Sequence, residues 1–264
     1  MSTLSGDART WRPGRFASVV VEELATQIIG GRLAPGDVLP TEPVLCETFG
    51  FSRTVIREAL KVLEERGLVR VEQGRGTTVR TRDAWNLLDP LVIRIALDYD
   101  EDASLLDSLM TVRRVLESDM ARAAAARLGD DDLAALADNI EKMAGSYDDY
   151  GRFRVYDLAF HAIVMKASGN EVGLTIVRAI HRHGGVTPRL SSSASIDALE
   201  RTVDEHRAVY EALAARDGDR AAGLISAHIG SAWAERRDRN LPLTAADHSY
   251  DDRPRCTSRP STST

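Results

Sequence analysis

The 264-residue sequence has few cysteines, few aromatic residues and no long hydrophobic run. Its two cysteines, Cys46 and Cys256, have neither the spacing of metal ligands nor that of a disulfide framework, which favours a reducing compartment. No apolar stretch approaches the roughly 18 residues of a membrane span, and the N-terminus has no apolar signal core. These absences predict a cytoplasmic protein that is not inserted in a membrane.

An excess of basic residues is also absent. The formal net charge is -6, which excludes a protein that binds nucleic acid through overall charge alone. The charge is uneven, however: residues 1–82 contain 12 Lys and Arg against 10 Asp and Glu, and residues 83–264 contain 22 against 30. A local basic patch is compatible with this balance, and the two parts of the chain are expected to meet different partners.

Helical periodicity is what the sequence does contain. Apolar residues recur at steps of three and four through most of the chain, between breakers rich in Gly, Pro and Asp. The pattern predicts a mainly α fold with an N-terminal winged helix-turn-helix and a C-terminal all-helical bundle. The expected parts are a flexible tail at 1–14, the winged domain at 15–82, a linker with a short helix at 83–102, a helical ligand-binding domain at 103–239 and a disordered tail at 240–264.

The winged domain is predicted from three helices followed by two β-rich runs around a Gly-bearing turn. Thr41 and Ser52 are expected to cap the second and third helices, and Gly50 lies in the turn between them. The third helix begins with the side chains expected of a recognition helix in a DNA groove, which are Ser52, Arg53, Thr54 and Arg57.

Two arginines of this helix, Arg53 and Arg57, are four residues apart and therefore share a face. Each guanidinium can bind guanine O6 and N7 bidentately, whereas Ser or Thr can reach phosphates. Arg75 is expected at the tip of the hairpin, near a neighbouring groove. The alternative is a solvated helix face, but the ordered set of helices, turn and basic wing favours DNA binding.

The winged domain resembles the GntR family of bacterial transcription regulators in residues 36–42, 52–60, 63–69 and 74–79. The resemblance implies a homodimer on a palindromic operator in double-stranded DNA. It places one group of residues in the major groove and another at the minor groove: Ser52, Arg53, Thr54 and Arg57 in the first, and Gln73, Gly74 and Arg75 in the second. Pro43 stands where some members have a third base-reading arginine, so one contact is absent.

A second group of residues suggests a metal site in the helical domain. Asp157 and His161 are four residues apart on one helix face, and His206 and His228 lie on two later helices. Nitrogen and oxygen ligands from three helices of a bundle suit a divalent ion such as Zn, Ni or Mn. On spacing alone, a surface hydrogen bond between Asp157 and His161 is the more common arrangement.

The helical domain resembles the FCD ligand-binding domain, which defines the FadR-type subfamily of GntR regulators, in residues 113–117, 157–161, 167–170, 205–206 and 227–228. In metal-binding members the positions of Asp157, His161, His206 and His228 are the ligands, whereas members that bind fatty acyl thioesters lack this set. Residues 84–90 resemble the linker of members that answer to sugar acids, notably galactonate-type regulators, and to lactate. The resemblance implies a repressor of a sugar-acid or hydroxy-acid catabolic operon, released by a small carboxylate bound at the metal.

Three smaller points remain open in the sequence. Arg113 is either a structural ion pair with Glu117 or an effector-binding group for a carboxylate. His181 and His183 precede a Gly-Gly break and either reach the pocket or are exposed to solvent, of which exposure is favoured. Trp85 and Leu88 are expected to pack between domains.

Two other functions are compatible with these residues. The first is a metal-dependent enzyme fused to a DNA-binding domain, since an open metal position activates water. A catalytic motif such as H-E-x-x-H or G-x-S-x-G is missing from the sequence, which favours a protein that is not an enzyme. The second is a constitutive DNA-binding protein without a ligand, which the large second domain with its buried polar groups disfavours.

Overall fold

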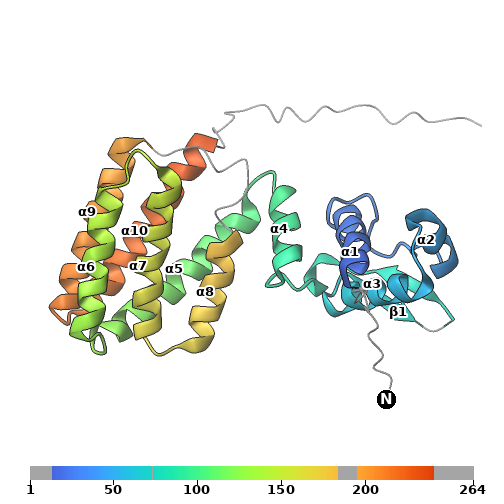
Figure 1. Ribbon diagram of the computed structural model, residues 1–264, viewed down its shortest axis with the longest axis horizontal. Helices are drawn as coiled ribbons and strands as arrows, with labels where there is room; N and C mark the ends of the chain where they lie inside the picture. Colours follow the sequence, from blue (N-terminus) through green and yellow to red (C-terminus); the bar gives the residue numbers. More distant parts are fainter. Residues whose placement is uncertain (1–13, 73, 184–194, 241–264) are drawn as a thin grey trace, which may run out of the picture.

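The computed structural model describes residues 14–72, 74–183 and 195–240. These residues form ten α-helices, one short 3-10 helix and a two-stranded sheet, so the predicted mainly α class is confirmed. Figure 1 shows two bodies, a small winged domain and a larger helical bundle, with helix α4 between them. None of the described helices is long and apolar enough to cross a membrane.

The winged domain is built on helices α1 (Gly14–Ile29), α2 (Glu42–Phe49) and α3 (Arg53–Glu65). The apolar residues that recur at steps of three and four face inward on both long helices. They are buried between α1 and α3, and include Val20, Leu24, Ile28, Ile56, Leu60 and Leu63. This packing leaves the polar face of α3 exposed, as the sequence predicts.

The turn between α2 and α3 has the predicted geometry. Gly50 ends α2 in the left-handed region, with φ of 70°, and the hydroxyl of Ser52 accepts a hydrogen bond from the Val55 amide at 3.5 Å. Thr41 occupies the cap position of α2, but its side chain makes no capping hydrogen bond. The N-cap prediction is therefore correct for both positions, and only Ser52 uses its side chain for it.

The wing is an antiparallel hairpin of β1 (Val69–Glu72) and β2 (Gly76–Val79). Val69 pairs with Val79 and Glu72 with Gly76, so the turn has only three residues. Gly74 adopts a φ of 80°, which a residue with a Cβ adopts only at a cost.

Helix α4 (Pro90–Asp98) follows the short 3-10 helix η1 (Arg82–Ala84) and connects the two bodies. Asp89 caps it by accepting from the amides of Leu91 and Val92. The two faces of α4 belong to different apolar clusters: Val92 and Ile95 join the core of the winged domain, and Ile93, Ala96 and Leu97 pack with the start of the bundle. The linker is thus a packed element rather than a loose connection.

The two apolar linker residues differ from each other. Trp85 packs against the core of the winged domain, whereas Leu88 is 51% exposed. The expected interdomain packing of Leu88 is therefore wrong in this chain.

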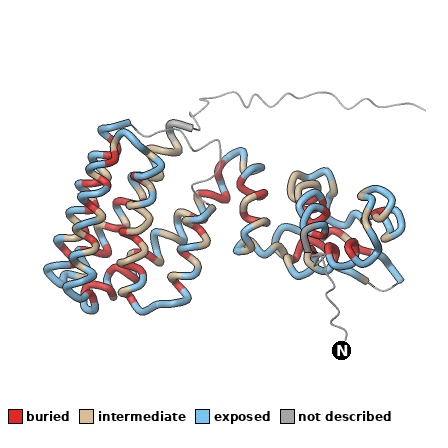
Figure 2. The backbone as a smooth tube through the Cα atoms, in the orientation of Figure 1, coloured by how far each residue is buried: buried red, intermediate tan, exposed pale blue. Residues whose placement is uncertain are grey.

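The bundle contains six helices: α5 (Ser104–Ala125), α6 (Asp130–Ala144), α7 (Tyr150–Ala167), α8 (Glu171–His183), α9 (Ile196–Ala214) and α10 (Gly218–Asn240). Helix α5 packs along α10, and α6 packs along α7 and α9. Figure 2 shows the buried residues concentrated on the inward faces of these helices. The core includes Met120, Leu136, Phe160 and Val203.

Helix α1 begins at Gly14 and α10 ends at Asn240, so one residue at each predicted tail boundary belongs to a helix instead. The rest of the two predicted tails lies outside the described residues.

Candidate metal centre and DNA-binding surface

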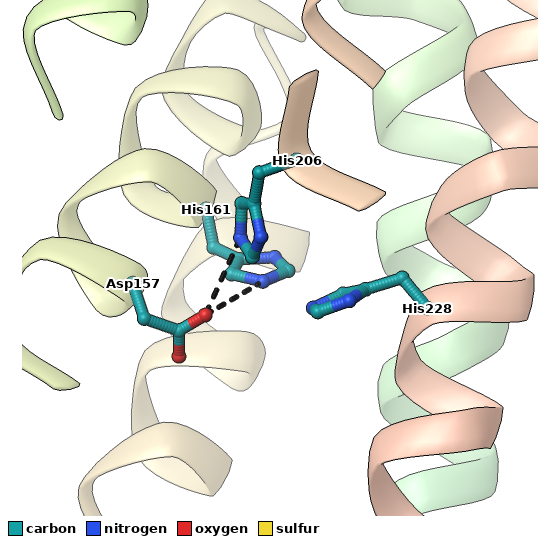
Figure 3. A group of neighbouring side chains, drawn as sticks. All are labelled: Asp157, His161, His206 and His228. Carbon is teal, nitrogen blue, oxygen red and sulfur yellow. Dashed lines mark ion pairs between the residues drawn. The ribbon is translucent and has the colours of Figure 1, made fainter. Parts of the chain in front are cut away.

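Four predicted ligands meet inside the bundle. Asp157 and His161 come from α7, His206 from α9 and His228 from α10, and their ligand atoms all lie within 4.8 Å of one another. The three histidines are buried, whereas the Asp157 side chain is 23% exposed. Figure 3 shows the four side chains directed at one another. The structure therefore brings together the whole set predicted from the sequence, in the interior and not at the surface.

The Nδ1 atom of each imidazole is engaged by an oxygen. The partners are Glu117 Oε2 for His161 at 2.6 Å, the Thr202 carbonyl for His206 at 2.7 Å and Glu205 Oε2 for His228 at 2.7 Å. A carbonyl or an ionised carboxylate can only accept, so each Nδ1 carries the proton. The Nε2 atoms of neutral imidazoles then present lone pairs, which is how metal-binding histidines are commonly oriented.

One of these lone pairs faces another acceptor. The Nε2 of His206 is buried without a hydrogen-bond partner, and it lies 3.3 Å from Asp157 Oδ1. The Nε2 of His161 lies 3.8 Å from the same oxygen. An unprotonated Nε2 and a carboxylate oxygen at this separation repel each other unless a cation lies between them, and a buried polar atom without a partner is costly. The donor set and this arrangement fit a divalent metal ion.

The protonation states of the side chains in the cluster also fit a divalent metal ion. Burial raises the pKa of Asp157, but the neighbouring imidazoles, His206 first, outweigh it and hold that pKa well below its usual value. Burial lowers the pKa of His161, and burial together with His206 lowers the pKa of His228 to about 4. At neutral pH, His161 and His228 are therefore neutral and Asp157 is ionised, as metal binding requires.

Glu117 links the metal cluster to Arg113. Its buried carboxylate accepts from Arg113 Nε at 2.5 Å and from His181 Nε2 at 2.9 Å, besides its contact with His161. Burial raises the pKa of Glu117, but Arg113 and then His161 hold it well below its usual value. Arg113 is therefore the ion pair that the sequence allows, and it also lines the cavity described below.

The expected solvent exposure of His181 is wrong. Its side chain is only 10% exposed because the ring turns inward to Glu117 at the end of α8. The side chain of His183 lies outside the described residues.

Sequence reasoning also missed the three groups that orient the imidazoles, Glu117, Thr202 and Glu205. Glu205 adjoins His206 in sequence but orients His228 on another helix. The spacing of residues along one helix therefore could not predict that Glu205 orients His228.

A cavity adjoins the cluster. The centres of water molecules can occupy a volume of about 100 Å³ within it. One water needs roughly 10–15 Å³ of such space, so the cavity has room for several waters or a small organic molecule. Asp157 and His228 line its wall together with His181 and Arg113. An ion held by the cluster would therefore be in reach of a ligand in the cavity.

The predicted DNA-binding residues lie at the start of α3. Ser52, Arg53 and Thr54 are exposed there. The Arg57 side chain is 68% exposed and pairs with Glu42 of α2, with Nε 2.8 Å from Oε2. At an exposed position such a pair adds little stability. The described geometry is that of a helix end accessible to a DNA groove.

The wing residues are only partly described. Gly74 and Arg75 are exposed in the hairpin turn, where the Arg75 amide donates to the Glu72 carbonyl at 3.0 Å. Gln73, the third predicted wing residue, lies outside the described residues.

Comparison with known proteins decides the family. The family described as "Bacterial regulatory proteins, gntR family" matches residues 16–79, and the FCD domain matches residues 108–231. The galactonate operon transcriptional repressor of Escherichia coli is 32% identical over 202 residues, which cover 76% of this chain and 88% of the repressor. The chain belongs to the GntR family. It is a DNA-binding transcription regulator with an FCD domain.

Other GntR regulators show the same extent of similarity. LutR, an HTH-type transcriptional regulator of Bacillus subtilis, is 30% identical over 206 residues, which cover 76% of this chain and 92% of LutR. Among solved structures, Lar, which controls expression of the Listeria monocytogenes agr system, aligns with a TM-score of 0.53 and 20% identity. That alignment covers 89% of this chain and 97% of Lar, and it supports the fold.

Proposed function

We propose that this GntR regulator is a homodimeric repressor of a sugar-acid or hydroxy-acid catabolic operon. A small carboxylate, bound at a divalent metal ion in the FCD domain, would release it from the operator. The observation that carries the proposal is the cluster of Asp157, His161, His206 and His228 at the wall of a cavity. The similarity to a galactonate operon repressor supports the class of operon.

The metal would anchor the effector. Four nitrogen and oxygen ligands suit Zn, Ni or Mn, and an octahedral ion with four protein ligands has two further positions. A 2-hydroxy acid offers a carboxylate and an α-hydroxyl, two oxygens that can chelate one ion. Arg113 lines the same cavity and can donate a charge-assisted hydrogen bond to the carboxylate.

The winged domain would read the operator. We assign Ser52, Arg53, Thr54 and Arg57 to the major groove, and Gln73, Gly74 and Arg75 to the minor groove. One such domain reads only a few base pairs, so two domains related by a twofold axis would read an inverted repeat. A regulator that binds an operator would act in the cytoplasm, where bacterial DNA lies.

Effector binding can release DNA only if the effector binds the DNA-bound state less well than the released state. A hundredfold preference for the released state supplies about 2.7 kcal/mol of coupling. The ligands come from α7, α9 and α10, so binding would tighten three helices of the bundle around one centre. Helix α4 packs on α5 and α8 of that bundle and on α1 of the winged domain.

The test is fluorescence anisotropy of a labelled operator, selected first from a pool of random duplexes. D-Galactonate and L-lactate are titrated into the complex with and without a chelator. We expect release by at least one acid in the metal-loaded protein, and none in the chelated protein or in His206→Ala. Arg207→Ala, at an exposed neighbour of His206, is the control and should respond normally.

Two results would contradict the proposal. Undiminished release in metal-free protein would mean that the metal is structural and that the effector binds elsewhere. A monomer in light scattering at operator-binding concentrations would contradict the dimeric repressor.

A further inference from the structure

We infer that the effector carries a second anionic group, a carboxylate or a phosphate, which binds Arg154 and Arg236 at the end of the cavity away from the metal cluster. This inference rests on the proposed function and narrows it to a class of ligand. It is carried by the arrangement of charged residues along one cavity wall.

The two arginines lie along the same helices as the metal ligands. Arg154 is three residues before Asp157 on α7, hence on the same face and about 4.5 Å away along the axis. Arg236 is eight residues after His228 on α10, about 12 Å along that axis. Both arginines line the cavity together with Asp157 and His228.

Tyr150 joins the far ends of the two helices. It lies one turn before Arg154 on α7, and its hydroxyl accepts from Arg236 Nη2 at 3.4 Å. The cavity therefore has a metal-ligand end at Asp157 and His228, and an arginine end at Arg154, Tyr150 and Arg236. A guanidinium is a strong donor for carboxylate and phosphate, and bidentate contact adds geometric specificity.

The charge of the lining favours a ligand with more than one negative charge. Among the described residues that line the cavity there are three arginines and two carboxylates. One of those carboxylates, Glu235, pairs with Arg201 Nη2 at 2.5 Å, and Arg113 is matched by the buried Glu117. A divalent ion adds two positive charges. A ligand with two anionic groups would balance more of the charge of the ion and the arginines than a monoanion would.

The length of a six-carbon acid fits this spacing. An extended chain covers about 3.5 Å for every three bonds, so C1 and C6 are roughly 6 Å apart. A ligand chelated through C1 would then place an anionic group on C6 about one helical turn away, beside Arg154. Arg236 lies farther along, and its long side chain also lines the cavity. Hexaric acids and 6-phosphorylated aldonic acids carry an anionic group at both C1 and C6, whereas aldonic acids have a neutral hydroxyl at C6.

The experiment compares acids that differ only at C6. D-Galactonate is compared with galactarate, and D-gluconate with glucarate and 6-phosphogluconate, in calorimetric titrations of the metal-loaded protein and in operator release. We expect the doubly anionic member of at least one pair to bind at least tenfold more tightly, equivalent to about 1.4 kcal/mol. Comparison of glucarate with 6-phosphogluconate shows whether a carboxylate or a phosphate is preferred.

Variants locate the second contact. Arg154→Gln and Arg236→Gln should each reduce the affinity ratio of the pair severalfold, while Arg152→Gln, exposed on the same helix α7, should keep it. Equal or weaker binding of the doubly anionic acids, with chelator-sensitive binding of the aldonates, would overturn this inference and leave the proposed function intact. A full response to every acid in chelated protein would overturn the proposed function as well.

Discussion

His161 donates its Nδ1 proton to Glu117 Oε2 across 2.6 Å, so a buried carboxylate determines which nitrogen of the ring faces the metal cluster. The same carboxylate accepts hydrogen bonds from Arg113 and His181. Glu117 therefore holds an imidazole, a guanidinium and the end of α8 in one arrangement. It acts through its neighbours and does not itself belong to the ligand cluster.

Substitution Glu117→Gln should weaken metal binding about 10–100-fold, because the amide no longer accepts as a charged partner for His161. The measurement is competition with a chelating dye, with circular dichroism as the check on folding. Glu141→Gln, exposed on α6, is the control and should bind metal as the unmodified protein does. Unchanged affinity in Glu117→Gln would show that the orientation of His161 does not depend on this carboxylate.

The stability of the metal-free protein should depend on His228. Its pKa is about 4 in the folded protein and about 6.5 in an unfolded chain, so the unfolded state binds more protons between these values. Stability therefore rises with pH through this window and is lost as the pH falls from about 6.5 toward 4. The contribution of His228 is at most about 3 kcal/mol.

Urea denaturation of chelated protein at pH 7, 5.5 and 4.5 measures this effect. In His228→Phe the decrease in unfolding free energy across the window should be smaller. If the pH dependence is identical in the variant, protonation of another group accounts for the acid lability.

Much of this architecture follows from local patterns in the sequence. Apolar residues such as Leu24 and Leu60 recur at helical spacing because one face of each helix must be buried, and Ser52 caps α3 through contacts within four residues. Spacing places only Asp157 and His161 on one helix face; the full set with His206 and His228 was predicted from the resemblance to the FCD domain.

Contacts between helices were not predictable from spacing. Glu205 orients His228 across 23 residues, His181 reaches Glu117 across 64, and Arg57 pairs with Glu42 across a turn. Such contacts depend on the distance and rotation of packed helices, which single-helix periodicity does not encode. The exposure of His181 was wrong for that reason: its position near a helix end indicates solvent, whereas packing of α8 on α5 turns it inward.

Arg53→Ala should lower the affinity for the selected operator by about 1–3 kcal/mol, which is the value of a bidentate contact to a base. Arg53 is exposed at the start of α3, so its truncation leaves the core unchanged. Lys61→Ala, two turns later on the same helix, is the control and should have a much smaller effect. Anisotropy with operator and with a scrambled duplex distinguishes the two roles: equal losses on both duplexes would indicate a phosphate contact and not a base contact.

The connection between the domains leads to the final prediction. Arg66, at the end of the recognition helix α3, donates from Nε to Asp89 Oδ2 at 3.0 Å, and both side chains are largely buried. Asp89 also caps α4, which packs on α5 and α8 of the bundle. A movement of α4 would therefore reach the end of α3 through this ion pair.

Arg66→Gln and Asp89→Asn should both reduce effector-induced operator release, by about 0.5–2 kcal/mol of coupling, with little change in operator affinity in the absence of effector. Asparagine still accepts hydrogen bonds at a helix cap, so Asp89→Asn removes the charge of the pair without removing the cap. Arg70→Gln, at an exposed ion pair of β1, is the control. The measurement is the shift in operator affinity at saturating effector; a full shift in both variants would show that the signal crosses between the domains by other contacts.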